Sequence, residues 1–450
     1  MASTDWISKL PDSVLHHIMS FMKAKAAVRT CVLSKRWRHL WASLQHLHFD
    51  FTEFEGIQKL PWLEHVPKYR KFISRMLQER DNIDVHTFDI QNFSEFYDDD
   101  DDDERGGEWV TYAIHHKARV IHFDINLWSN LPQSIYTCAS LEELHVDMVD
   151  PAPIIYPASV SLPRLRSLDL TFVDHHFLKL VLLQCPALES LSLSDCNGID
   201  LSGIPFQKLR KLNVSCCTML SAAEELSLPS LESFMYVGSM STLRVMGIES
   251  IPSLTYAYVF AEEYEDGDIV SFNNDNFNLL RALTNARKLE LYAFEAAIRD
   301  LLKEELQNCP TFLNLAELYI YGCASCLSNM IARMLESSPY LQKLTICHDE
   351  SYNHKVLNCE RTIIKGALFK SMYIDTIAIE VSRHYNTVKP LIEELVECLK
   401  GRSKLFKINL IIRKYASRSR LIIDEDFDTL CSSLAQQHPQ INVSYKLIER

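Results

Sequence analysis

One short pattern returns along most of this 450-residue chain and limits what it can fold into. An apolar residue is followed by two variable residues, a second apolar residue, one variable residue and a third apolar residue, as in Leu141-Glu-Glu-Leu-His-Val. The alternation predicts a short strand with one buried face, and such a strand needs equivalent neighbours to complete its core. The chain is therefore expected to stack one repeating unit beside the next.

The copies of this pattern follow one another at a nearly constant interval, as in the steps of 24 and 23 residues from Leu141 to Leu165 to Leu188. Clear copies begin at Leu141, Leu165, Leu188, Leu209, Leu231, Leu254, Leu315 and Leu341, a weaker one begins at Ala286, and degenerate ones begin at Leu44, Val85, Ala118, Ile374 and Leu405. Apolar residues at helical spacing fill segments between them, such as 176–185 and 327–336.

The interval and the pattern resemble leucine-rich repeats, which turn out of each strand at an Asn or Cys. Cys196, Cys217 and Cys323 lie at that position. The predicted fold over residues 46–450 is an α/β solenoid: a curved leucine-rich-repeat array with a parallel sheet on its concave face and helices on its convex side. Residues 94–108 are expected to form an acidic loop insertion, and the C-terminal repeats to be atypical capping repeats.

Composition narrows the function classes. Hydrophobic residues at 47% and charged residues at 23% are typical of a folded protein and exclude wholesale disorder. A net charge of −13 argues against a protein that coats nucleic acid. The absence of a leader-like start and of any apolar run near 20 residues predicts a chain without a membrane span. The 13 Cys are expected to be reduced thiols, so the expected location is the nucleus, the cytoplasm or both.

Residues 5–45 do not fit the repeat and predict a small three-helix module. Pro11 opens the first helix, and Ser34 is placed as the N-cap of the third. Trp37, Leu40, Trp41 and Leu44 form one apolar face of that third helix. Three helices in so short a segment have a marginal core, which suits a module that docks to a partner.

The two ends of this module resemble the F-box. Leu10-Pro11-Asp12-Ser13-Val14-Leu15 is similar to its opening helix, and Leu33-Ser34-Lys35-Arg36-Trp37 to the plant form of its closing helix. An F-box followed by leucine-rich repeats is the arrangement of plant substrate receptors of SCF-type ubiquitin ligases. The resemblance implies a Skp-type adaptor as partner, cullin and RING subunits reached through it, and an unknown protein substrate. It implies adaptor contacts by Leu10, Pro11, Leu15, Ile18, Val32, Leu33 and Trp37.

Other interpretations stay open for the same segments. The basic stretch Lys35-Arg-Trp-Arg-His is compatible with the recognition helix of a DNA-binding helix-turn-helix. The whole module is also compatible with a helical cap that only covers the end of the solenoid. An F-box protein can also act as a scaffold that binds the adaptor without delivering substrates. The run Asp98 to Glu104 is expected to be solvated, with recruitment of a basic partner as its functional alternative.

The sequence contains no catalytic constellation, so the chain is expected to be no enzyme and to need no cofactor. Cys323 and Cys326, with Cys347, are candidate ligands for a zinc ion. The repeat turn already accounts for Cys323, so no metal site is predicted. A small-molecule co-ligand would need clustered cations on the concave face. Arg166, Arg210 and Lys211 are the candidates, which is weak support.

The alternation also predicts which strand residues line the concave face. The predicted pairs run from His145/Asp147 to Thr345/Cys347, and they change from small polar to aromatic near Met235. The expected substrate-binding patch consists of Met235, Tyr258, Phe260, Tyr292, Tyr319 and Tyr321, with the acidic segment 262–275 at its rim. The alternative is that a C-terminal segment or loop covers these rings.

Overall fold

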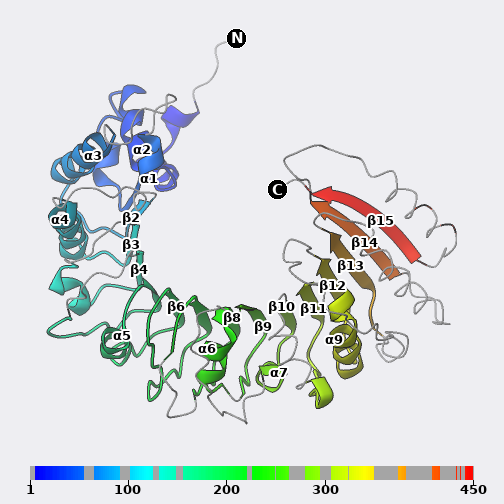
Figure 1. Ribbon diagram of the computed structural model, residues 1–450. Helices are drawn as coiled ribbons and strands as arrows, with labels where there is room; N and C mark the ends of the chain where they lie inside the picture. The colour runs from blue at the N-terminus through cyan, green and yellow to red at the C-terminus, as the bar shows by residue number, and fades with distance from the viewer. Residues whose placement is uncertain are drawn as a thin grey trace. The chain divides into compact units, whose positions relative to one another are not determined.

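We describe the protein from a computed structural model, shown in Figure 1. The structure describes residues 6–54, 65–91, 102–124, 131–147, 156–219, 226–248, 250–262, 279–293, 306–322, 324–348, 373–381, 408–415, 432, 436 and 441–448. The chain divides into two compact units, unit 1 (Met1–Asp200) and unit 2 (Leu201–Arg450). Among the described residues, no helix has the length and apolar character needed to cross a membrane.

Unit 1 contains six parallel strands of five residues each. They are β1 (His46–Asp50), β2 (Thr87–Gln91), β3 (Val120–Asp124), β4 (Glu143–Asp147), β5 (Ser167–Thr171) and β6 (Ser190–Ser194). Each strand pairs with the next along the chain, so that Leu144 lies opposite Leu168 and Leu168 opposite Leu191. The second and fourth residues of each strand are buried, because only those side chains face the core.

Unit 2 continues the same plan with strands of 5 to 8 residues. They are β7 (Lys211–Ser215), β8 (Ser233–Ser239), β9 (Tyr256–Glu262), β10 (Lys288–Ala293), β11 (Glu317–Gly322), β12 (Lys343–His348), β13 (Thr376–Val381), β14 (Ile408–Tyr415) and β15 (Ile441–Ile448). These strands also pair in parallel with their neighbours in chain order. All fourteen predicted copies of the pattern thus lead into a strand, and β15 is one strand more than predicted.

Helices lie on one side of the strands in each unit (Figure 1). In unit 1 they are α3 (Val66–Glu79), α4 (Asp102–His115) and α5 (His175–Leu182); in unit 2 they are α6 (Met240–Val245), α7 (Leu279–Ala282) and α9 (Ala324–Ser337). Their apolar faces are buried, as Ile73 in α3 and Ile331 in α9 illustrate. The opposite side, which we call the helix-free face, corresponds to the predicted concave face and carries no described helix of the repeats (Figure 1).

Backbone hydrogen bonds join successive repeats just before each strand. The carbonyl of Arg119 accepts hydrogen bonds from the amides of Glu142 and Glu143, at 2.7 and 3.0 Å. The carbonyl of Glu142 does the same for the next repeat, at 2.7 and 3.1 Å. In unit 2 the carbonyls of Arg210, Glu232, Thr255, Arg287, Ala316 and Gln342 repeat the arrangement. One main-chain acceptor per repeat therefore receives two donors, whatever side chain it carries.

The turn that leaves a strand also repeats. Phe172, Asp195 and Cys216, which directly follow β5, β6 and β7, have φ angles of 53°, 52° and 50°. Next in the chain, Cys196 and Cys217 are buried, and each thiol donates to the carbonyl two residues earlier at 3.2 Å. The predicted structural place of these two cysteines is confirmed, whereas Cys323 lies outside the described residues.

The N-terminal module has two α-helices rather than three. They are α1 (Asp12–Met19) and α2 (Ala24–Arg29), and the module also contains the short 3-10 helices η1 (Ile7–Lys9), η2 (Thr30–Val32) and η3 (Leu40–Ser43). The predicted third α-helix is replaced by turns and η3, held by bonds three residues apart such as Trp37 N–H to the Ser34 carbonyl at 3.2 Å. Tighter 3-10 turns bring residues spaced by three onto one side, so Trp37 and Leu40 both reach the core.

The acidic run differs partly from its prediction. Helix α4 begins at Asp102, so the part of segment 94–108 from Asp102 onward is helical rather than a loop. Carboxylates are favourable in the first turn of a helix because they face its exposed amides and the positive end of its dipole. Residues 92–101 lie outside the described residues.

Candidate functional site

The N-terminal module presents a cluster of exposed apolar side chains. Val32 and Leu33 are 82% and 63% exposed, and Ile18 on α1 is 42% exposed. Phe21, which directly follows the end of that helix and its C-cap, is 76% exposed. So many bare apolar groups on a small module are typical of an interaction surface. Pro11 is also exposed and Leu10 is half-buried, so five of the seven predicted adaptor-binding residues are at least partly exposed to solvent.

The other two predicted residues lie in the core of the module. Leu15 is 0% exposed and Trp37 is 5% exposed. Both side chains pack inside the module, so they stabilise the elements that carry the exposed residues and are not themselves part of the surface. Val14 and Phe21, two further apolar residues of this segment, are exposed. In a module this small, helical spacing identifies an apolar stripe but does not say which part of the stripe is covered.

Arg36 holds the two ends of the module together. Its guanidinium donates to the carboxylate of Asp12 through Nε at 2.7 Å, and it also donates to the carbonyl of Leu10. The first contact joins the segment after η2 to the start of α1, and the second fixes the Leu10-Pro11 turn. A planar guanidinium with several donors suits this double contact. The sequence placed Arg36 in the F-box-like closing segment and in a basic stretch, and neither pattern indicated this contact.

The predicted substrate-binding patch is formed on the helix-free face of unit 2. Met235, Tyr258, Phe260, Tyr292, Tyr319 and Tyr321 are all half-buried and alternate with buried core residues along β8 to β11. The structure brings the five rings together: neighbouring ring centroids are 4.9 Å apart for Tyr258 and Tyr292, 5.3 Å for Phe260 and Tyr292, and 4.8 Å for Tyr292 and Tyr321. The rings are partly exposed, so they are not simply core.

A carboxylate and an ammonium lie beside these rings. Glu290 Oε1 is 2.6 Å from Lys288 Nζ and accepts a hydrogen bond from the Tyr256 hydroxyl at 3.3 Å. Burial, followed by the nearby Glu290 carboxylate, raises the pKa of Tyr256 to about 12. Burial also raises the pKa values of Tyr258 and Tyr292. These phenols therefore remain neutral hydrogen-bonding groups over the physiological pH range.

The last predicted pair on this face does not contribute to the patch. Thr345 and Cys347 are 4% and 0% exposed, contrary to the expectation that they face solvent. In the sheet register they lie opposite Tyr319 and Tyr321 of the preceding strand. Rings of that size extend over the smaller side chains beside them, which explains why alternation alone gave the wrong exposure.

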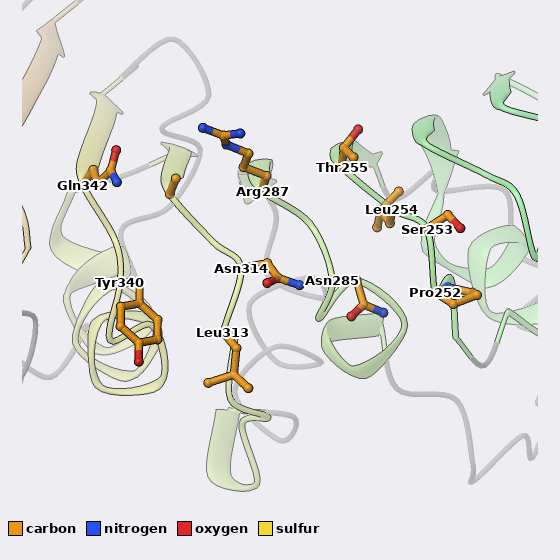
Figure 2. A pocket seen from close by; sticks show the side chains of 11 residues that line it. Pro252, Ser253, Leu254, Thr255, Asn285, Arg287, Leu313, Asn314, Tyr340 and Gln342 are labelled. Carbon is orange, nitrogen blue, oxygen red and sulfur yellow. The ribbon is translucent and has the colours of Figure 1, made fainter.

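Unit 2 also has a groove where the chain approaches β9 to β12. Its volume is about 490 Å³, and its lining includes Pro252, Arg287, Leu313, Tyr340 and Gln342. Figure 2 shows the Arg287 and Gln342 side chains near the strands and the Leu313 side chain farther from them. None of the six residues of the predicted patch lines this groove. Across the described part of the chain, no three His, Cys, Asp or Glu residues are grouped to hold a metal ion.

Two predicted features fall outside what the structure describes. Residues 263–278 contain most of the acidic segment expected at the rim of the patch. Cys323 is also outside, and nothing is described of the Cys326 side chain. Arg210 and Lys211, two of the three co-ligand candidates, lie before and at the start of β7, and Arg210 is paired with Glu232 at 2.7 Å.

Comparisons with known proteins agree with both parts of the chain. The F-box domain family matches residues 7–49, and the family described as FBD-associated F-box protein At5g56370, LRR repeats, matches residues 108–257. F-box/LRR-repeat protein At5g02930 of Arabidopsis thaliana is 26% identical over 414 residues, covering 86% of this chain and 82% of that protein.

Two further Arabidopsis thaliana proteins show the same likeness. FBD-associated F-box protein At4g10400 is 28% identical over 367 residues, 78% of this chain and 80% of the relative. F-box/LRR-repeat protein 13 is 32% identical over 220 residues, 46% of this chain and 45% of the relative. The matches thus cover the small helical module and the strand array together.

Proposed function

Since the chain is an F-box/leucine-rich-repeat protein, we propose that it is the substrate-recognition subunit of an SCF-type ubiquitin ligase. F-box domains bind Skp-type adaptors, and leucine-rich repeats are protein-interaction modules. The observation that best supports the proposal is the exposed apolar cluster around Val32 and Leu33, within the segment that matches the F-box family. The proposal places the protein in the nucleus, the cytoplasm or both.

The proposed mechanism is proximity. The F-box fixes the receptor to the adaptor, and the adaptor links it to the cullin and RING subunits. The repeats hold a protein substrate, so that its lysines are present at high effective concentration near the conjugating enzyme. The chain itself performs no chemical step in this scheme and needs no cofactor.

The aromatic patch of unit 2 is the proposed substrate-binding site. Tyr and Phe supply large contact areas with little loss of side-chain freedom, and such residues dominate the energetics of many interfaces. The lysine and glutamate nearest the rings compensate each other, as the 2.6 Å contact of Lys288 with Glu290 shows. The patch therefore suits apolar side chains of a partner better than isolated charges.

Adaptor binding is tested with the full chain and a purified Skp-type adaptor. The double variant Val32→Asp, Leu33→Asp should raise the dissociation constant at least about 30-fold, since hot-spot residues contribute about 2 kcal/mol or more each. Leu313→Asp is the matched control, because Leu313 is 62% exposed but lies in unit 2. Equal binding by all three proteins would contradict the proposal.

Substrate capture is tested in plant extract with the triple variant Tyr258→Ala, Tyr292→Ala, Tyr319→Ala. The expected result is loss of bound candidate substrates with adaptor recovery unchanged. Each partner lost by the variant is then offered to the reconstituted ligase. Ubiquitination of that partner supports the receptor function, whereas binding without ubiquitination would favour the alternative, a scaffold that binds the adaptor without delivering substrates.

A further inference from the structure

The charges on the strands of unit 1 are distributed very unevenly. Strands β1 to β6 contain no Lys or Arg, but they contain six carboxylates and four histidines. The side chains of eight of them are described, and all eight occupy the first, third or fifth position of a strand, which is the side opposite the buried apolar residues. They are Asp50, Asp89, Glu143 and Asp169 with His46, His48, His122 and His145, and we call this set the carboxylate–histidine face.

Histidines, rather than permanent cations, are the neighbours of several of these carboxylates. His48 Nδ1 lies 3.1 Å from Asp89 Oδ2, and His145 Nδ1 lies 2.9 Å from Asp169 Oδ2. His122 Nε2 is farther from Glu143, at 3.9 Å. A neutral imidazole donates a hydrogen bond but cancels no charge. In each of these three contacts the carboxylate therefore faces an imidazole and not a permanent cation.

Asp89 is an independent sign that the face lacks a donor. Its side chain is only 7% exposed, and Oδ2 is satisfied by His48 and by Gln91 Nε2 at 2.9 Å. Its Oδ1 is also buried and receives no hydrogen bond from the residues that the structure describes. Asp89 lies between His48 and His122 in the register, on the same side of the sheet. A buried carboxylate oxygen without a donor is costly, and a cationic donor relieves that cost.

Unit 2 differs on its own helix-free face. Three of its strands, β7, β10 and β12, begin with a lysine, and two of these lysines are paired within the sheet. Lys288 contacts Glu290 at 2.6 Å, and Lys343 contacts Glu317 at 3.5 Å. Asp50 is the carboxylate of the unit 1 face with a described lysine partner, Lys23 at 2.5 Å. The uncompensated negative charge is thus a property of unit 1.

We propose that the carboxylate–histidine face binds a segment of a partner protein that is rich in lysine and arginine. Strands β1, β2, β4 and β5 each add one carboxylate of this face, and neighbouring strands are about 4.8 Å apart. A basic segment crossing the strands meets a row of opposite charges, and charge complementarity of this kind sets partner choice and association rate. The inference rests on the proposed function for the fate of the bound partner, but the binding itself does not require the ligase.

The histidines make this binding dependent on pH. Burial, with His86 and His48 beside it, lowers the pKa of His46. Burial also lowers the pKa of His122, which is opposed by Asp89 and Glu143 and assisted by His145 and His48. His145 faces Asp169 and His122. With their lowered pKa values, His46 and His122 are neutral at pH 7.5, and their protonation at lower pH adds positive charge that repels a basic segment.

The test uses the full chain and a fluorescein-labelled peptide of twelve residues in which lysine and serine alternate. Fluorescence anisotropy at pH 7.5 and low salt should detect saturable binding, and the matched glutamate–serine peptide should not bind. Glu143→Gln, Asp169→Asn should raise the dissociation constant about three- to tenfold, because exposed charge pairs contribute modestly each. Glu143 is exposed and Asp169 is half-buried, and both changes keep the size of the side chain, so the variant is expected to fold, which circular dichroism checks.

Two controls keep the proposal falsifiable. Glu232→Gln, Glu317→Gln removes the same charge from unit 2 and should change the dissociation constant less than about twofold. Lowering the pH to about 5.5 should weaken binding by the wild-type chain. No binding of the lysine peptide, or equal weakening by both double variants, would overturn the inference. Adaptor binding measured on the same proteins reports separately on the proposed function, since its loss would leave the peptide result unaffected.

Discussion

At the scale of single residues, burial makes the contribution of one thiol to stability depend on pH. Cys185 is 5% exposed, and its thiol donates to the Val181 carbonyl at 3.2 Å. Burial raises the pKa of this thiol from 9.0 to about 12. The folded chain therefore keeps the proton at a pH where the unfolded chain has lost it. A group of this kind contributes stability fully below about pH 9, and the contribution is lost as the pH rises toward about 12.

This linkage predicts a specific alkaline effect. Between pH 8 and pH 10 the free energy of unfolding of the wild-type chain should fall about 1.4 kcal/mol more than that of Cys185→Ser, which keeps a donor but does not titrate there. Urea unfolding at the two pH values, with a reductant present, measures the difference. Cys216→Ser is the control because Cys216 is exposed, and it should match the wild-type chain. A Cys185→Ser variant with wild-type pH dependence would contradict the argument.

Residue-scale prediction from sequence failed where exposure depends on neighbours. Leu15 and Ile18 lie three residues apart on the same helical stripe, yet one is buried and the other is 42% exposed. The difference arises from the short turns that place Trp37 and Leu40 in the core, and no helical pattern encodes it. The predicted exposure of Thr345 and Cys347 was wrong for a similar reason, since large rings on the preceding strand lie beside them.

At the scale of elements, α5 illustrates how the helices of unit 1 are fixed at their ends. Asp174 is its N-cap, and its Oδ1 accepts a hydrogen bond from the Phe177 amide at 2.8 Å. Its Oδ2 accepts one from the Tyr156 hydroxyl at 2.5 Å. Burial would raise the pKa of Asp174, but the bonds from Phe177 and Tyr156 and the nearby His175 outweigh it and lower the pKa. The cap is thus strongest when the carboxylate is ionised.

Removing this cap should destabilise unit 1 measurably. Asp174→Ala is expected to cost about 1 kcal/mol of unfolding free energy at pH 7, and Asp174→Asn less, because an amide oxygen still accepts the bond. The stabilisation is present above the ordinary carboxyl pKa of 3.8, so the difference should shrink as the pH falls below about 4. Urea unfolding at both pH values provides the measurement. Asp84→Ala, which removes an exposed partner of Lys117, should cost less than about 0.5 kcal/mol.

At the scale of the whole molecule, each repeat is bonded mainly to its sequence neighbours. Stability in such arrays is close to a sum of repeat and nearest-neighbour contributions. Leu144→Ala in β4 and Leu291→Ala in β10 each remove a buried side chain and should cost about 2–5 kcal/mol. Amide hydrogen exchange should show lost protection in β3 to β5 for the first variant and in β9 to β11 for the second. Equal loss along the whole chain would show one cooperative unit instead.

The sequence predicted the large-scale plan well for a physical reason. A strand with one apolar face cannot be stable alone, so fourteen copies of one pattern leave stacking as the available solution. The final strand, β15, was not predicted because the residue three positions before its first apolar residue, Ile441, is His438 and not an apolar residue. The helix-free faces followed from alternation, but the contrast in charge between the strands of the two units emerged only with the strand bounds.

The shared carbonyl between repeats affects how repeat arrays of this kind can change in length. Each junction is made from main-chain groups. The two amides of a duplicated repeat can therefore donate to the carbonyl of the repeat before it, and its own carbonyl can accept from the repeat after it. A gene can therefore lengthen or shorten the array by unequal recombination without redesigning any junction. The N-terminal module can thereby stay constant while the length of the array and the chemistry of its helix-free face change.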